Sequence, residues 1–240
     1  MKRRPSPNFD RRASAIDMIV LHYPGLRTVA AALDRLCDPQ AKVSAHYLID
    51  EQGQVYVLVE EEHRAWHAGV SSWHGVTDIN SCSVGIELAN PGHEFGYRAF
   101  PEAQMQSVAD LARAVMRRHD ISAARVLGHS DVAPERRTDP GELFDWRRLA
   151  RQGIGLWPDE VADAAGFHAV DGDDRDQVAF LQSQLLAAGY GLVVDGHFGP
   201  RTRAAVMAFQ RHFRPTRIDG RADAETQAML EAWLRLFLDG

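Results

Sequence analysis

The sequence predicts an α/β fold, a mixed central β-sheet flanked by helices, followed by a second, small all-α domain of three helices. Three observations carry this prediction. Nearly continuous apolar segments are typical of buried strands, helical patterns alternate with them, and a helical repeat occupies the C-terminal quarter. With 240 residues, 45% of them apolar, the chain is long enough to build both domains.

Five short apolar segments in the first 157 residues have the length of strands. They are residues 16–21, 46–50, 55–59, 83–88 and 125–127. The second and third flank a four-residue turn and so predict a β-hairpin. Between strands, Thr28 is placed to cap a short helix, and Pro101 opens a long amphipathic one. The segment from Trp66 to Asn80 is irregular and is expected to be a loop lining a groove.

The C-terminal repeat pairs a glutamine with an Asp-Gly turn and a threonine. Gln182 is followed by Asp195-Gly196 and Thr202, and Gln210 by Asp219-Gly220 and Thr226, with seven residues from aspartate to threonine in both copies. The pattern predicts helices at 177–188, 201–213 and 223–236, the first stopped by Gly189.

Four segments follow from these patterns. Residues 1–15 are polar and contain proline, so they are expected to form an arm that is either laid over the surface or disordered. Residues 16–157 form the α/β domain. Residues 158–175, acidic and rich in alanine and glycine, are a linker. Residues 176–240 form the helical domain.

Composition excludes several classes of protein. The net charge is −6 and the basic residues are scattered, which argues against nucleic acid as the main partner. No stretch approaches the ~20 apolar residues that span a bilayer. The basic start is followed by Pro5-Ser6-Pro7-Asn8, so no secretory signal is visible. Cys37 and Cys82 lie far apart and are expected to be free thiols.

Residues suited to metal chemistry stand at predicted strand ends. His22 and His129 each follow an apolar segment, and Asp139 lies in a turn closed by proline and glycine. Catalytic zinc takes three nitrogen and oxygen ligands and keeps a fourth position open. Glu87, a carboxylate among apolar neighbours, is a candidate general base, and Arg137 is a candidate to face an oxyanion.

Other readings of these residues remain open on spacing alone. Eleven histidines make chance groupings easy, and an ion pair with an arginine is the commoner role for a lone buried glutamate such as Glu87. Asp131 is interpreted as a loop-capping residue rather than a fourth ligand. Both a core position and a sugar-stacking platform fit Trp66 and Trp73.

Five motifs in this order resemble one known family. They are Leu21-His22-Tyr23, Ser44-Ala45-His46-Tyr47, Trp66-His67-Ala68-Gly69, Gly85-Ile86-Glu87, and Gly128-His129-Ser130-Asp131 through Thr138-Asp139-Pro140-Gly141. Over residues 15–150 the chain resembles the zinc-dependent N-acetylmuramoyl-L-alanine amidases of type 2, which share their fold with peptidoglycan recognition proteins. Residues 176–236, with Asp195-Gly196-His197-Phe198-Gly199-Pro200, resemble the helical peptidoglycan-binding domain of cell-wall hydrolases.

The resemblance implies a reaction and a set of roles. His22, His129 and Asp139 would hold one Zn²⁺, and Glu87 would activate water to cleave the amide between N-acetylmuramic acid and L-Ala. Arg137 stands where bacterial members usually have lysine, which departs from the family pattern. The substrate groove would include four residues: Tyr47, Trp66, His67 and Asn80.

The same resemblance leaves the binding partner and the cellular compartment open. The partner is peptidoglycan or soluble muropeptide, and the runner-up function is a non-catalytic peptidoglycan-binding protein on the same fold. A third reading treats the helical domain as a protein-interaction module on a cytoplasmic recycling enzyme. The absent signal favours a role in the cytoplasm of a bacterium or delivery from outside the cell, whereas a wall-binding domain favours the periplasm or cell envelope. Nothing in the sequence sets the oligomeric state.

Overall fold

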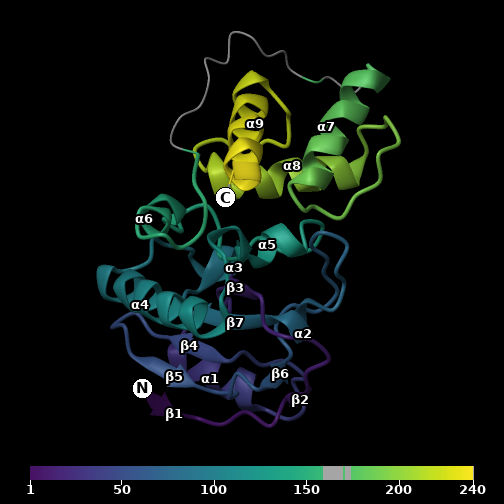
Figure 1. The fold of residues 1–240 in the computed structure, drawn as a ribbon. Helices are drawn as coiled ribbons and strands as arrows, with labels where there is room; N and C mark the ends of the chain where they lie inside the picture. Colours follow the sequence, from purple (N-terminus) through teal and green to yellow (C-terminus); the bar gives the residue numbers. More distant parts are fainter. Residues whose placement is uncertain (159–169, 171–173, 240) are drawn as a thin grey trace.

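The computed structural model describes residues 1–158, 170 and 174–239, so most of the predicted linker at 158–175 lies outside the described residues. An α/β part and a helical part lie one above the other, with α8 next to α5 at their junction (Figure 1). None of the described helices is both long enough and apolar enough to cross a membrane.

A six-stranded mixed sheet forms the centre of the α/β part. Its order is β1 (Lys2–Arg3), β5 (Val55–Val57), β4 (Tyr47–Ile49), β7 (Ser83–Leu88), β3 (Met18–His22) and β8 (Val126–Gly128). Strands β4, β7, β3 and β8 run parallel, whereas β4 and β5 form the predicted antiparallel hairpin. Because parallel neighbours share their direction, the C-terminal ends of β7, β3 and β8 meet at one edge of the sheet.

Side chains alternate between the two faces of this sheet, and the alternation decides where polar residues can lie. Ile19 and Leu21 of β3 pack with Ile86 of β7 against α4 (Glu102–His119). Met18 and Val20 belong to a different cluster on the opposite face. His22 continues that second set, so its side chain lies on the face away from α4.

The remaining elements are short connections and the helices of the C-terminal part. They are β2 (Phe9–Arg11), paired with β6 (His63–Ala65), α1 (Val29–Cys37), α2 (Ile79–Cys82), α3 (Gly92–Phe95), the 3₁₀ helix η1 (Ala123–Arg125), α5 (His129–Val132), α6 (Trp146–Ala150), α7 (Arg175–Ala187), α8 (Pro200–Phe213) and α9 (Ala224–Asp239). The three predicted C-terminal helices are confirmed to within three residues at each end. The N-terminal segment contributes the short strands β1 and β2. Both cysteines are free, as predicted, with Cys82 buried and Cys37 partly exposed.

The predicted repeat has the same hydrogen bonds in both copies. The Gln182 amide donates to Asp195 Oδ1 at 2.9 Å and Thr202 Oγ1 at 3.0 Å, while its oxygen accepts from the backbone N–H of Asp195 and Gly196. Gln210 repeats the pattern one copy later with an Asp-Gly turn and a threonine. Each buried glutamine therefore ties the turn to the start of the next helix.

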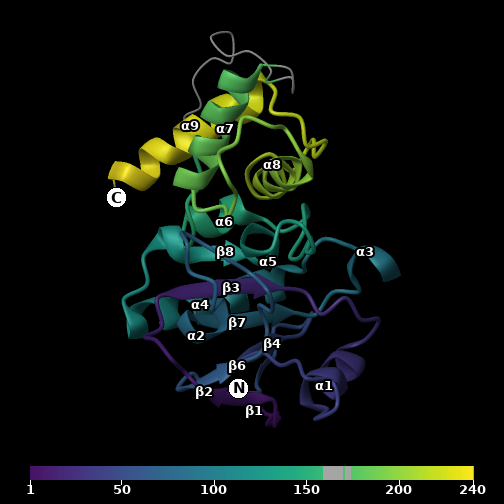
Figure 2. The ribbon, with the colours of Figure 1, turned by 90° about the vertical axis from the view of Figure 1, so that its right-hand side faces the viewer.

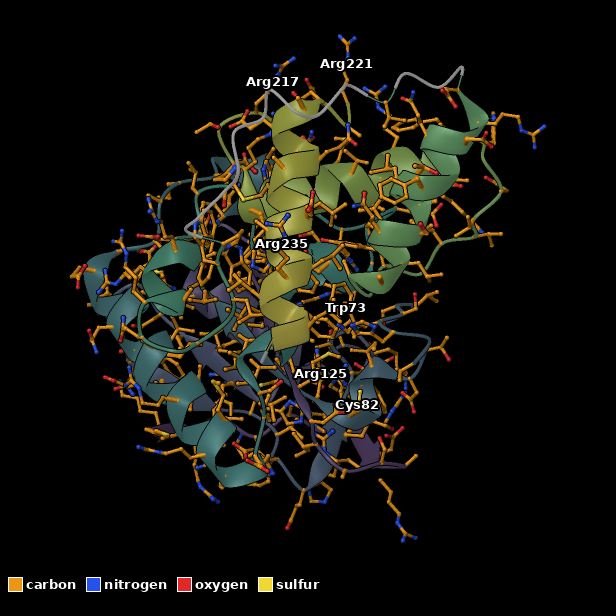
Figure 3. The ribbon with its side chains drawn as sticks, turned by 45° about the horizontal axis from the view of Figure 1, so that its top comes forward. Trp73, Cys82, Arg125, Arg217, Arg221 and Arg235 are labelled. Carbon is orange, nitrogen blue, oxygen red and sulfur yellow. The ribbon has the colours of Figure 1, made fainter. Side chains whose placement is uncertain are left out.

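The helical part packs directly against the α/β part. It lies beside β8, the edge strand of the sheet (Figure 2). One apolar cluster contains Ile79 and Leu127 from the α/β part together with Phe209 and Trp233 from the helices. Trp73 lies at this junction (Figure 3), with its ring centroid 5.2 Å from that of Tyr190. A shared core of this kind holds the two parts as one packed unit.

Candidate metal and active site

Three ligating atoms from three separate segments converge at the C-terminal edge of the sheet. Nδ1 of His22, at the end of β3, lies 2.9 Å from Nδ1 of His129, the first residue of α5. Oδ2 of Asp139 lies 3.2 Å from the first nitrogen and 2.9 Å from the second. All three residues are buried. Within the described part of the chain this is the only group of three such residues close enough to hold a metal ion.

Hydrogen bonds on the far side of His129 determine which nitrogen faces the cluster. Nε2 of His129 lies 3.0 Å from the carbonyl oxygen of Ala68, which can only accept a hydrogen bond. This contact assigns the hydrogen to Nε2, and in that tautomer Nδ1 presents its lone pair to His22 and Asp139. Metal-binding histidines are usually oriented in this way by a carbonyl or carboxylate behind the ring.

A second relay orients His22. The Ser83 hydroxyl donates to the carbonyl of Ile79 at 2.5 Å, so its oxygen is left to accept from Nε2 of His67 at 3.2 Å. Nδ1 of His67 then accepts from Nε2 of His22 at 3.0 Å. Nδ1 of His22 therefore also carries no hydrogen and directs its lone pair at His129 and Asp139. Two lone pairs and a carboxylate oxygen in mutual contact repel one another unless a cation lies between them, so the donor set fits a bound metal.

Glycine at position 85 makes room for this relay. A Cβ atom there would lie 2.4 Å from Cγ of His67 and 2.6 Å from its Nδ1, far inside van der Waals contact. Only a residue without a side chain lets the His67 ring lie across β7 and reach His22.

The electrostatics of the site keep His22 and Asp139 in the forms that bind a metal. Burial, reinforced by the neighbouring His129, lowers the pKa of His22 to about 4, so this ring is neutral at pH 7. Burial alone would raise the pKa of Asp139, but the two histidines beside it hold that pKa well below its usual range. Neutral imidazole and ionised carboxylate are the forms that ligate metals.

Glu87 stands next to the cluster on the neighbouring strand. It pairs with His22 in the parallel register of β3 and β7. Burial, with a further contribution from the charge of Asp139, raises the pKa of Glu87 to about 8. Among the described residues nothing hydrogen-bonds its buried Oε2 atom. A carboxyl group in this state can exchange protons near neutral pH and has one oxygen free to meet a water or a substrate.

A groove with a volume of about 470 Å³ opens over the three ligands and Glu87. Arg35, Arg136 and Arg137 give its wall a basic character, and Trp66 adds an aromatic surface. Arg137 is exposed, and its guanidinium has no hydrogen-bonding or ion-pair partner among the described residues, which leaves it free for a bound molecule.

The four predicted groove residues lie in different places. Trp66 and His67 line the groove, although the ring of His67 is chiefly engaged behind His22. Tyr47 and Asn80 do not line it. The Tyr47 hydroxyl donates to Glu61 at 2.6 Å, and Oδ1 of Asn80 accepts from the backbone N–H groups of His67 and Ala68. Asn80 therefore supports the segment that orients both histidine ligands.

Comparison with known proteins gives this geometry a family. Residues 12–142 match the family described as N-acetylmuramoyl-L-alanine amidase, which is more than half of the chain. The chain belongs to this amidase family. Residues 174–230 also match a family described as a peptidoglycan binding domain.

Two proteins, AmiD and AmpDh3, resemble the chain over nearly its whole length. It is 40% identical to the N-acetylmuramoyl-L-alanine amidase AmiD of Escherichia coli over 235 residues, covering 92% of this chain and 83% of AmiD. The structure of AmiD in complex with the substrate anhydro-N-acetylmuramic acid-L-Ala-D-γ-Glu-L-Lys matches with a TM-score of 0.80, 38% identity and coverage of 95% and 93%. AmpDh3 of Pseudomonas aeruginosa matches with a TM-score of 0.76, 32% identity and coverage of 93% and 92%.

These matches confirm the predicted fold class, family and enzyme class. The protein is an N-acetylmuramoyl-L-alanine amidase, a hydrolase of peptidoglycan or its fragments, with an α/β catalytic part and a helical part of the peptidoglycan-binding type. Its relatives are bacterial proteins.

Proposed function

We propose that Nδ1 of His22, Nδ1 of His129 and Oδ2 of Asp139 hold one zinc ion. The observation that carries the proposal is the convergence of these three atoms within 3.2 Å. The hydrogen bonds behind both rings assign the ring hydrogens to Nε2, on the side away from the cluster. Two histidines and one carboxylate suit a catalytic zinc with an open fourth position. When bound, zinc supplies Lewis acidity and lowers the pKa of water to about 7.

Glu87 is proposed to move the protons of the reaction. It accepts a proton from the attacking water as the new C–O bond forms at the lactyl carbonyl of N-acetylmuramic acid. It then delivers that proton to the nitrogen of L-Ala as the C–N bond breaks, so that a carboxylic acid and a free amine leave. No described residue hydrogen-bonds its buried Oε2, which is therefore open to the attacking water, and its raised pKa places proton exchange near neutral pH and favours delivery of the proton to the leaving nitrogen.

Arg137 and the groove are proposed to recognise the substrate. The free guanidinium of Arg137 can donate to the oxyanion that develops at the attacked carbonyl. In a stem peptide with γ-linked D-Glu, as in the ligand bound to AmiD, the α-carboxylate of that residue is free. Arg35 on the groove wall suits such a carboxylate, whereas Arg136 already donates to the carbonyl groups of Ala68 and Val70. The Trp66 ring offers a face for a sugar.

The helical domain is proposed to bind peptidoglycan, which favours the cell envelope over the cytoplasm as the place of action. Its match to the peptidoglycan-binding family supports this role. A non-catalytic binding protein would be expected to lack a metal ligand or the glutamate, and all four of these side chains are present at the site. Cell fractionation tests the compartment.

Mass spectrometry of products tests the proposed reaction. The full-length protein is incubated with anhydro-N-acetylmuramic acid-L-Ala-D-γ-Glu-L-Lys and with intact sacculi, with and without a zinc chelator. We expect release of a peptide that begins with a free L-Ala amine, and loss of this product with chelator. Cleavage of another bond, or turnover unaffected by the chelator, contradicts the proposal. Glu87→Gln serves as the matched variant, expected to keep its zinc and lose activity.

A further inference from the structure

The segment that carries two of the proposed zinc ligands lies along helix α8 of the helical part. Residues 129–146 contain His129 and Asp139, and three acidic side chains of this segment face basic side chains of α8. The pairs are Asp131–His212 at 2.8 Å, Glu135–Arg201 at 3.5 Å and Glu142–Arg211 at 3.9 Å. We name residues 129–146 the ligand loop. Because Arg201 lies near one end of α8 and His212 near the other, the whole helix takes part in this contact.

The innermost pair is fully enclosed. The Asp131 side chain is 1% exposed and the His212 side chain 3%. Oδ2 of Asp131 accepts from the backbone N–H of Gly128 at 2.8 Å and from Nδ1 of His212, and Oδ1 accepts from the Tyr190 hydroxyl at 3.2 Å. Two of these three donors come from the helical part. A buried carboxylate that loses its donors is strongly unfavourable, so the position of Asp131 depends on the helical part.

His212 also contacts the other end of the ligand loop. Its ring stacks on that of Trp146, with centroids 3.8 Å apart and the planes 20° from parallel. Between these two points, the backbone N–H of Ser130 donates to the carbonyl of Asp139 at 2.9 Å, which ties the segment of one ligand to the other. One imidazole therefore holds both flanks of the loop: Asp131, two residues after His129, and Trp146, seven residues after Asp139.

We propose that His212 is a positioning residue for the metal site, and that the helical domain completes that site in addition to any role in binding the cell wall. The inference rests on the proposed zinc ligands. His212 and Tyr190 hold the Asp131 side chain by hydrogen bonds, and Asp131 in turn holds the loop that presents His129 and Asp139. The lone pairs of the cluster then face one another before any metal arrives, which favours metal binding by pre-organisation.

Three variants of the full-length chain test the proposal. His212→Phe keeps an aromatic ring to stack on Trp146 and removes the donor to Asp131. His212→Asn keeps a donor near the position of Nδ1 and removes the ring. Trp233→Leu changes the shared apolar core but removes none of the three donors to Asp131 and no ring that stacks on His212, so it is the control for general loss of stability.

The readouts are hydrogen exchange of residues 128–142 in metal-free protein and the zinc dissociation constant from competition with a chelator. His212→Phe is expected to speed exchange in this segment and to weaken zinc binding, each by about tenfold or more. His212→Asn is expected to recover most of the zinc affinity. Trp233→Leu is expected to lower the melting temperature and change both readouts by less than about twofold.

The outcomes separate this inference from the proposed function. Wild-type exchange and wild-type zinc affinity in His212→Phe overturn the inference, as does an equal effect of Trp233→Leu. If wild-type protein binds no zinc, the proposed function fails while the exchange measurement still decides the loop contact. If His212→Phe does not fold, Tyr190→Phe removes the hydroxyl that donates to the same carboxylate, and unchanged exchange in that variant overturns the inference.

Discussion

Replacement of Gly85 by alanine tests the relay that orients His22. The added methyl group would lie 2.4 Å from Cγ of His67 and 2.6 Å from its Cδ2 and Nδ1. Carbon atoms in contact lie about 3.5–4.0 Å apart, so the ring has to move by about 1 Å. The contact between His67 Nδ1 and His22 Nε2, now 3.0 Å, would then exceed hydrogen-bonding distance.

The expected cost falls on both stability and metal binding. Overpacking of this size destabilises a buried site by about 1–3 kcal/mol. Loss of the partner behind a metal-ligating histidine weakens metal binding by about 10–100-fold. That loss corresponds to about 1.4–2.7 kcal/mol of zinc binding free energy.

Competition with a chelator measures the zinc dissociation constant, and a double-mutant cycle assigns the cause. In a His67→Ala background the ring that meets the methyl group is gone, so adding Gly85→Ala is expected to change zinc affinity by less than about twofold. Wild-type zinc affinity in the single variant Gly85→Ala would refute the relay. A full additional loss in the His67→Ala background would show that the methyl group acts elsewhere.

Three further predictions concern charge and domain packing. Arg137→Lys keeps the cation and is expected to retain activity within about tenfold, whereas Arg137→Ala is expected to lose about 10²-fold in kcat; equal rates for both would remove Arg137 from the reaction. Burial opposes ionisation of Glu61, but hydrogen bonds, first among them the one from Arg118, lower its pKa to about 2. The unfolded chain has a pKa of about 4.3 at this residue. The ion pair therefore stabilises the fold fully above about pH 4.3, and this stabilisation is lost as the pH falls towards 2. Because Arg118 is half exposed, Glu61→Gln is expected to cost only about 2 kcal/mol in urea unfolding at pH 7 and almost nothing near pH 2; a constant difference across that range would contradict the assignment. Deletion of residues 174–240 uncovers the shared apolar core and is expected to lower the melting temperature and solubility; an unchanged melting temperature would show that the α/β part needs no partner.

Local patterns made the main elements of the fold predictable. The buried segment that became β7 matches its predicted range of 83–88, because both of its faces are covered and, after Ser83, only Glu87 interrupts the apolar sequence. Thr28 caps α1 as expected, with its hydroxyl accepting from Ala31 N–H. His22 and His129 could be found because parallel strands bring their C-terminal ends to one edge.

Contacts between segments far apart in the sequence could not be predicted from local patterns. Tyr47 and Asn80 were predicted to line the groove but do not, and His67 lines it with its ring engaged mainly behind His22. The pairing of His67 with His22 spans 45 residues, and no local pattern encodes it. One signal was available: Gly85 inside an apolar strand indicates that another group approaches the backbone closely. Asp131 was correctly interpreted as a capping residue, since it accepts from Gly128 N–H, but its partner His212 lies 81 residues away.

Anomalous diffraction at the zinc edge, from crystals of the full-length protein grown with zinc, tests the central claim most directly. The structure predicts one strong peak at about 2.0–2.2 Å from Nδ1 of His22, Nδ1 of His129 and a carboxylate oxygen of Asp139, with Nε2 of both rings still hydrogen-bonded to protein groups. Absence of a peak at these three atoms, or a zinc ion held through Nε2 of either histidine, would contradict the account.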